Sequence, residues 1–95
     1  MMSPRRERFA AHVVGRVQGV GFRAFVCETA EQLSLAGSVK NGRDGGVWVE
    51  AEGPREGLEQ LLRALHSGPP SARVDRVTVN WLEPKGETRF TLLPM

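Results

Sequence analysis

The sequence has 95 residues, of which 40% are hydrophobic and 25% are charged. This length accommodates one compact domain and excludes two, and the composition is that of an ordinary soluble globular chain. The formal net charge of +2 is too small to indicate a nucleic-acid-binding protein by itself. The single cysteine, Cys27, excludes an intramolecular disulfide and favours a reducing compartment.

The N-terminal residues are basic, but no long apolar stretch follows them. The sequence therefore shows neither the pattern of a secretory signal nor an apolar run as long as a membrane span. We expect a flexible tail over residues 1–7 and a single domain over residues 8–95. We also expect a cytoplasmic protein that makes no contact with a membrane.

The first half of the chain predicts a strand, a helix and a second strand. Apolar residues alternate over residues 9–14, which is typical of a strand with one buried face. Residues 22–35 carry apolar side chains three or four positions apart, which predicts an amphipathic helix. We expect Gly37 to end this helix in a left-handed conformation. Residues 38–41 form a short predicted strand.

The second half predicts a hairpin, a helix and two more strands. A glycine-rich turn at residues 42–46 links the second strand to a third, in which Val47, Val49 and Ala51 face inward. Trp48, Glu50 and Glu52 then point to the other face of the sheet. The third strand is thus predicted to have one inward and one outward face.

A second helix is predicted between Gly53-Pro54 and Gly68-Pro69-Pro70, because proline favours a helix start. Its strongest signal is a set of leucines at positions i, i+3, i+4 and i+7, namely Leu58, Leu61, Leu62 and Leu65. Val77, Val79 and Trp81 alternate in a fourth strand, and Val74 is out of phase, which indicates a bulge. Residues 90–93 form a short final strand.

The element order is thus β-α-β-β-α-β with an added strand at the end. With right-handed crossovers, this order predicts a ferredoxin-like α+β sandwich, in which one antiparallel sheet carries both helices on one face. No repeat or interdomain linker is apparent. The fold hosts many functions and does not decide the chemistry.

The most informative stretch is residues 15–23, Gly-Arg-Val-Gln-Gly-Val-Gly-Phe-Arg, which joins the first strand to the first helix. Its three glycines allow positive φ angles, and backbone N–H groups at a helix start form a site for an anion. Arg23 lies in the first helical turn, where a cation opposes the helix dipole. An anion between the helix start and Arg23 would remove this conflict, so we predict a phosphate-binding loop.

Other interpretations of this stretch stay open. It is not a Walker loop, because no Lys-Ser or Lys-Thr pair follows the glycines. Residues 19–24 match the dinucleotide pattern G-x-G-x-x-A, but the chain lacks the parallel strands of that fold. A tight turn without a ligand is a further alternative. Asn41 precedes a glycine-rich turn, and by position alone a structural role is favoured over a functional one.

The sequence contains no motif typical of a metal site or of a catalytic triad. His12 and His66 lie far apart, and there is no HExxH or CxxC motif. We expect both histidines and Cys27 to be structural residues. The sequence thus predicts neither a metal nor a cofactor.

Two blocks resemble a known family. Residues 15–23 closely resemble the first signature of the acylphosphatases, and residues 37–45, Gly-Ser-Val-Lys-Asn-Gly-Arg-Asp-Gly, resemble the second. The resemblance continues to the end of the second helix and so covers nearly the whole chain. Ser38 and Lys40 depart from the tryptophan and arginine that the family often has. The resemblance implies a ferredoxin-like fold and a metal-independent acylphosphatase.

The resemblance also implies residue roles, with Arg23 as the phosphate anchor and Asn41 as the residue that positions water. The implied phosphate-binding residues are those of the loop: Gly15, Arg16, Val17, Gln18, Gly19, Val20, Gly21, Phe22 and Arg23. An acyl phosphate releases a carboxylate, which needs no general acid, and its loose transition state requires hydrogen-bond donors and geometry. Expected partners are a small acyl phosphate and inorganic phosphate, the latter as product and competitive inhibitor. We expect a monomer.

Two further functions remain open. Ferredoxin-like sheets often bind single-stranded RNA through exposed aromatic residues, but Trp48 is the one candidate and the RNP patterns are missing. Acylphosphatase-like modules also occur inside larger maturation proteins, as regulatory or carbamoyl-transfer accessory domains. A chain of this length with its own start favours a free-standing enzyme. The physiological acyl phosphate is not determined by these residues.

Overall fold

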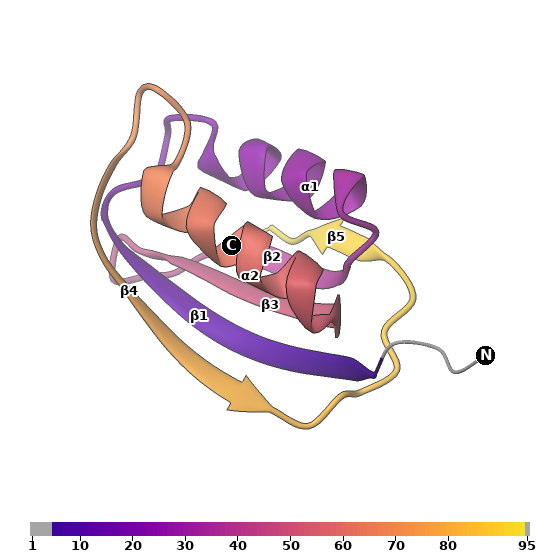
Figure 1. Ribbon diagram of the computed structural model, residues 1–95. Coiled ribbons are helices and arrows are strands. Elements are labelled where there is room, and N and C mark those ends of the chain that lie inside the picture. Colours follow the sequence, from indigo (N-terminus) through magenta and orange to yellow (C-terminus); the bar gives the residue numbers. More distant parts are fainter. Residues whose placement is uncertain (1–4, 95) are drawn as a thin grey trace.

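The computed structural model describes residues 5–94. Its elements are, in chain order, β1 (Arg6–Arg16), α1 (Phe22–Gln32), β2 (Ala36–Asn41), β3 (Val47–Pro54), α2 (Arg55–Ser67), β4 (Arg73–Leu82) and β5 (Phe90–Leu92). The strands form one sheet in the order β4-β1-β3-β2-β5, and both helices lie on the same face of it (Figure 1). The predicted ferredoxin-like α+β sandwich is confirmed.

The sheet is antiparallel except at one edge. β1 pairs antiparallel with β3 and with β4, and β2 pairs antiparallel with β3. β5 pairs parallel with β2, so the short final strand makes the sheet mixed. β4 and β5 occupy opposite edges. Residues 83–89, which we call the β4–β5 strap, must therefore cross the end of the sheet.

The core lies between the sheet and the two helices. It is built from the inward residues of β1, β2 and β3 and from the apolar stripes of α1 and α2, as the alternation and the helical spacing predict. The largest fully buried side chains of this core are Phe9, Phe22, Leu58, Leu61, Leu65, Val13, Val17, Val26, Val39, Val47 and Val49. Val17 and Phe22 belong to the predicted phosphate loop, so the core anchors both ends of that loop.

The end of α1 differs from the prediction. The helix ends at Gln32, and Ser34 takes the left-handed conformation with φ 57°. Gly37 lies in β2 instead, with φ 137°. A Cβ atom there would lie 2.0 Å from the carbonyl oxygen of Glu50. The prediction that Gly37 caps the helix was therefore wrong. Glycine is required at this position because β3 approaches the backbone of β2 closely.

The first strand is longer than predicted, and the fourth contains the expected bulge. β1 begins at Arg6, so Arg6 and Glu7 belong to the sheet, and residues 1–4 of the expected tail lie outside the described residues. Opposite β1, Val14 pairs with Arg76 while Gly15 pairs with Val74. The extra residue in β4 confirms the bulge that the phase of Val74 predicts. Within residues 5–94, neither helix is long and apolar enough to cross a membrane.

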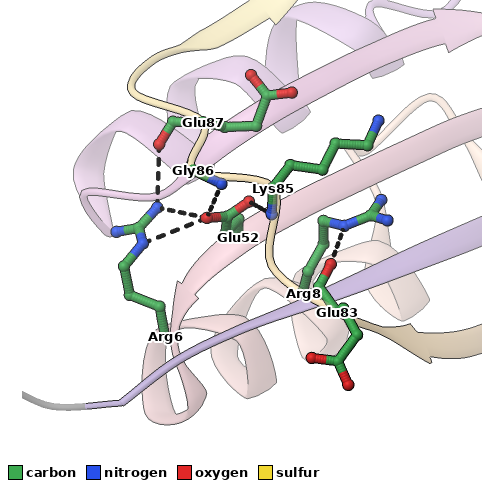
Figure 2. Close-up of polar contacts among 7 residues, drawn as sticks. All are labelled: Arg6, Arg8, Glu52, Glu83, Lys85, Gly86 and Glu87. Atoms are coloured by element: carbon green, nitrogen blue, oxygen red, sulfur yellow. Dashed lines mark hydrogen bonds and ion pairs between the residues drawn. The ribbon is translucent and has the colours of Figure 1, made fainter.

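Glu52 is a fully buried carboxylate beneath the β4–β5 strap (Figure 2). It accepts hydrogen bonds from the backbone amides of Lys85 and Gly86, each at 2.8 Å, and from the Arg6 guanidinium at 3.3 Å. Burial by itself would raise the pKa of Glu52. The strap amides, including that of Glu87, and Arg6 outweigh burial and hold this pKa below its usual value. The ionised carboxylate thus ties the strap to β3.

Candidate active site

A cavity of about 190 Å³ opens between the start of α1 and the end of β2. Its lining residues come from the predicted loop, from α1, from β2 and from β5: Val17, Gly19, Gly21, Phe22, Arg23, Ala24, Asn41 and Leu92. The fold thus brings Arg23 and Asn41 to one cavity, although 18 positions separate them in the sequence. The sequence alone did not determine this juxtaposition.

The start of α1 carries no cap from the described residues. Gly21 precedes the helix, no side chain among residues 5–94 caps it, and the first turn contains no acidic residue. The first helical hydrogen bond joins the Phe25 amide to the Gly21 carbonyl at 3.0 Å. The amides of the preceding helical residues therefore have no partner within the helix, and their partial positive charge favours an anion.

Two glycines give the loop its shape. Gly19 and Gly21 have φ angles of 73° and 78°, as the glycine pattern predicts. In the described part of the chain, no atom lies within 4 Å of a Cβ built on either residue. The backbone conformation, and not lack of space, therefore requires glycine at these two positions.

The Arg23 side chain is oriented by the chain end. Its Nη1 donates to the carbonyl oxygen of Leu93 at 2.9 Å. Leu93 follows β5 and in turn donates its amide to the Val39 carbonyl of β2 at 2.8 Å. Within residues 5–94, Arg23 forms no ion pair with a carboxylate. The rest of its planar fork is available to two oxygens of a phosphoryl group.

Gln18 links the loop to the turn that follows Asn41. Its Nε2 donates to the carbonyl oxygens of Gly42 at 2.8 Å and Gly46 at 2.9 Å. The side chain therefore fixes the position of Asn41 relative to the loop and does not line the cavity. The sequence placed Gln18 in the loop but did not show that its side chain bonds to the turn after Asn41.

The same turn is held by a cluster on the outer face of the sheet. Asp44 accepts the Gly46 amide at 2.9 Å and lies 2.7 Å from Nε2 of His12. The Gly46 amide, supported by the charge of His12, holds the pKa of Asp44 below its usual value. His12 also stacks on Trp48, with ring centroids 4.1 Å apart. One face of Trp48 is therefore covered by His12.

Four predicted loop residues do not line the cavity. Gly15 and Arg16 belong to β1, and Gln18 and Val20 point elsewhere. Gly15 has φ 142°, and a Cβ atom on it would lie 2.1 Å from the carbonyl oxygen of Arg73. The structure therefore explains Gly15 by the close approach of β4 at the bulge.

Gly15→Ala should destabilise the fold by about 1–3 kcal/mol, because the new Cβ overlaps β4. The folded variant should bind inorganic phosphate within about twofold of the unchanged protein, since Gly15 lies outside the cavity. Urea unfolding and phosphate titration would measure the two effects. Gly57→Ala is the control, because its Cβ would lie 3.2 Å from the end of the flexible Leu35 side chain and 3.6 Å, an ordinary contact distance, from the Leu33 carbonyl oxygen. A large loss of phosphate affinity in Gly15→Ala would instead place Gly15 in the binding loop.

The described part of the chain offers this cavity neither a metal-binding cluster nor a reactive thiol. Within residues 5–94, no three His, Cys, Asp or Glu side chains are grouped so that they could hold a metal ion. Burial, with a contribution from Glu31, raises the pKa of the Cys27 thiol. Cys27 therefore stays protonated near neutral pH and packs on α1 against the core.

Comparison with known proteins gives one consistent result. The sequence model of the acylphosphatase family matches residues 9–92. An acylphosphatase of Corynebacterium diphtheriae is 53% identical over 87 residues, which cover 87% of this chain and 90% of that protein. The crystal structure of acylphosphatase from Bacillus subtilis superposes with a TM-score of 0.89 at 40% identity, and covers 92% of this chain and 98% of that one.

A larger protein contains a similar domain. Full-length HypF, in its phosphate- and nucleotide-bound form, matches 97% of this chain with a TM-score of 0.90 and 32% identity. The match covers 12% of the HypF chain. The architecture described above therefore occurs both as a small protein and as a small part of a large one.

Proposed function

Because this chain belongs to the acylphosphatase family, whose activity is the hydrolysis of acyl phosphates, we propose that the cavity at the start of α1 is its catalytic site. The observation that carries the proposal is that Arg23, the loop and Asn41 line one cavity. Arg23 and the loop amides bind the phosphoryl group, and Asn41 positions the attacking water. The substrate is a small acyl phosphate.

The phosphoryl group needs donors that match the charge of its transition state. Phosphoryl transfer proceeds through a loose transition state with charge on three equatorial oxygens. The uncapped start of α1 and the Arg23 side chain both line the cavity, so their donors are available to this charge. Such donors are already oriented before the reaction, so the protein needs little reorganisation to stabilise the charge.

Asn41 positions the attacking water and does not act as a base. Its side-chain oxygen accepts a hydrogen bond from water and holds the water in line with the bond that breaks. The carboxylate then leaves on the side of phosphorus opposite the water, and it needs no proton at neutral pH. No general acid or strong base is required by this scheme, and the described residues that line the cavity include neither.

We propose that the reaction is metal-independent, because Arg23 and the amides supply the charge that a metal would otherwise supply. Hydrolysis of benzoyl phosphate by the isolated protein should continue at an unchanged rate in excess chelator. Inorganic phosphate should inhibit competitively, since it occupies the same amides and guanidinium. Loss of turnover on chelation, with recovery when a divalent metal is restored, would refute this part of the proposal.

Asn41→Ala should lower kcat by roughly a hundredfold or more, the usual cost of losing a positioned polar group in the transition state. The affinity for inorganic phosphate should stay within about twofold, because phosphate binds to the loop and not to Asn41. Steady-state kinetics and phosphate inhibition measure the two quantities. Asn80→Ala, at an exposed position of β4, is the control and should leave both unchanged. An equal loss of phosphate affinity in Asn41→Ala would argue against the role of Asn41.

The similarity to part of HypF supports a second candidate, in which this domain serves as an accessory module of a larger assembly. The same assay separates the two candidates, because an accessory role does not require turnover by the isolated chain. Similarity over 90% of the acylphosphatase of Corynebacterium diphtheriae favours the free enzyme. We further propose that the protein is a monomer, and sedimentation would test this.

A further inference from the structure

Glu52 lies at the end of the sheet opposite the proposed active site. It pairs with Ala36 at the start of β2, whereas Asn41 ends that strand. Five residues of extended strand correspond to about 16 Å. Glu52 therefore cannot touch a phosphoryl group in the cavity, and any effect on catalysis must pass through other residues.

The β4–β5 strap is attached to the sheet at two points, by Glu52 at Lys85 and Gly86 and by Arg8, whose Nε donates to the Glu83 carbonyl oxygen at 2.7 Å. Both oxygens of Glu52 accept strap amides, and Arg6 donates to Glu52 at 3.3 Å and to the Glu87 carbonyl at 3.1 Å (Figure 2). Among residues 5–94, Glu52 is the one polar or charged residue whose side chain is fully buried. The strap is thus attached at residues 85–87, a few residues before β5 begins at Phe90.

β5 has little apolar burial of its own. Phe90 is buried, whereas Thr91 and Leu92 are exposed. The strand is otherwise held by β2, through the bond from the Gly37 amide to the Arg89 carbonyl at 2.9 Å and the bond from the Leu93 amide to Val39. The position of β5 therefore depends on the strap that precedes it.

The end of β5 reaches the active site. Leu92 lines the cavity, and the carbonyl oxygen of Leu93 accepts Nη1 of Arg23 at 2.9 Å. A shift of this carbonyl would release or tilt the guanidinium. Such small displacements of a catalytic group can lower a rate by up to about a hundredfold.

We propose that Glu52 is a positioning residue for Arg23, acting through the β4–β5 strap, β5 and the Leu93 carbonyl. The inference rests on the proposed role of Arg23 and adds to it a determinant at the far end of the sheet. Glu52 does not contact substrate in this scheme. It sets the orientation of the Arg23 guanidinium, which contacts the substrate.

Glu52→Gln tests the inference, because it keeps the side-chain shape but replaces one acceptor with a donor that opposes a strap donor. We expect kcat/KM for benzoyl phosphate to fall by about tenfold while the folded fraction, followed by circular dichroism, is unchanged. The Arg23 Nε–Hε signal in NMR spectra should shift or broaden. Glu59→Gln is the matched control, since Glu59 is an exposed carboxylate on α2 that accepts from Arg55, away from the strap. Its activity and Arg23 signal should not change.

A double-mutant cycle separates positioning from lost stability. In an Arg23→Ala background, Glu52→Gln should have no further effect on the residual rate, because the residue that it orients is gone. Leu61→Val, in the core of α2, lowers stability without touching the strap and should leave kcat/KM unchanged. Unchanged activity in Glu52→Gln, or an effect that is additive with Arg23→Ala, would overturn the inference.

A second variant tests the positioning role of Glu52 if Glu52→Gln does not fold. Arg6→Gln removes the guanidinium bonds to Glu52 and Glu87, and its half-exposed side chain can be replaced without opening the core. The same loss of rate and the same coupling to Arg23 are expected, and their absence would overturn the inference. If Arg23→Ala alone kept full activity, the proposed function would fail instead.

Discussion

Arg23→Ala should lower kcat/KM for an acyl phosphate by roughly a hundredfold to a thousandfold. The substitution removes a charged donor from the cavity, and the loss of one oriented donor to a developing oxyanion has this effect on rate. Affinity for inorganic phosphate should fall as well, because hydrogen bonds to charged groups contribute about 1.5–3 kcal/mol each. Steady-state kinetics with benzoyl phosphate and competitive inhibition by phosphate would measure both losses.

Arg23→Lys is the control for charge alone. Lysine keeps the positive charge but lacks the planar fork that can hold the Leu93 carbonyl and two phosphoryl oxygens together. We therefore expect little recovery of the rate. Full recovery by lysine would show that charge suffices and would remove the geometric part of the proposed mechanism.

Glu52→Ala should lower the free energy of unfolding by about 2–4 kcal/mol, because it leaves the Lys85 and Gly86 amides without their acceptor and Arg6 without its carboxylate. Urea denaturation at neutral pH would measure the loss. Glu50→Ala is the control on the same strand. The Glu50 side chain is 43% exposed, so the loss of its ion pairs with Arg8 and Lys85 should cost at most about 1 kcal/mol. Equal effects of the two substitutions would mean that the strap amides are satisfied by water.

The contribution of Glu52 should also depend on pH. Its pKa is lower in the folded protein than the ordinary value of 4.5, so folding favours the ionised form. The stabilisation is therefore complete above the unfolded pKa and is lost as the pH falls through the folded value. The difference in unfolding free energy between the unchanged protein and Glu52→Ala should be constant near neutrality and shrink below about pH 4.5. A difference that grew on acidification would contradict this sign.

Sequence patterns predicted most of the helices and strands, because each of these elements is specified by residues close together in the chain. The leucine spacing of α2, the alternation in β3 and the glycine loop before α1 reflect backbone periods and φ preferences that a short stretch carries by itself. The exceptions have a common cause. Gly15 and Gly37 are glycines because a neighbouring strand comes within 2.1 Å and 2.0 Å of where a Cβ would lie. Such contacts join residues far apart in the chain, and no local pattern contains them.

In the candidate site, too, some features follow from the local sequence and others only from the tertiary structure. The sequence by itself determined a strand, a glycine loop with positive φ and an arginine at a helix start, and its two signatures indicated the acylphosphatase family. Only the tertiary structure decided that Asn41 lines the same cavity, that Gln18 bridges to its turn, and that Leu93 orients Arg23. Bond lengths and side-chain sterics fix the local features. The register of β2 against β3 and the path of the strap across the sheet fix the others, because these depend on the packing of the whole chain.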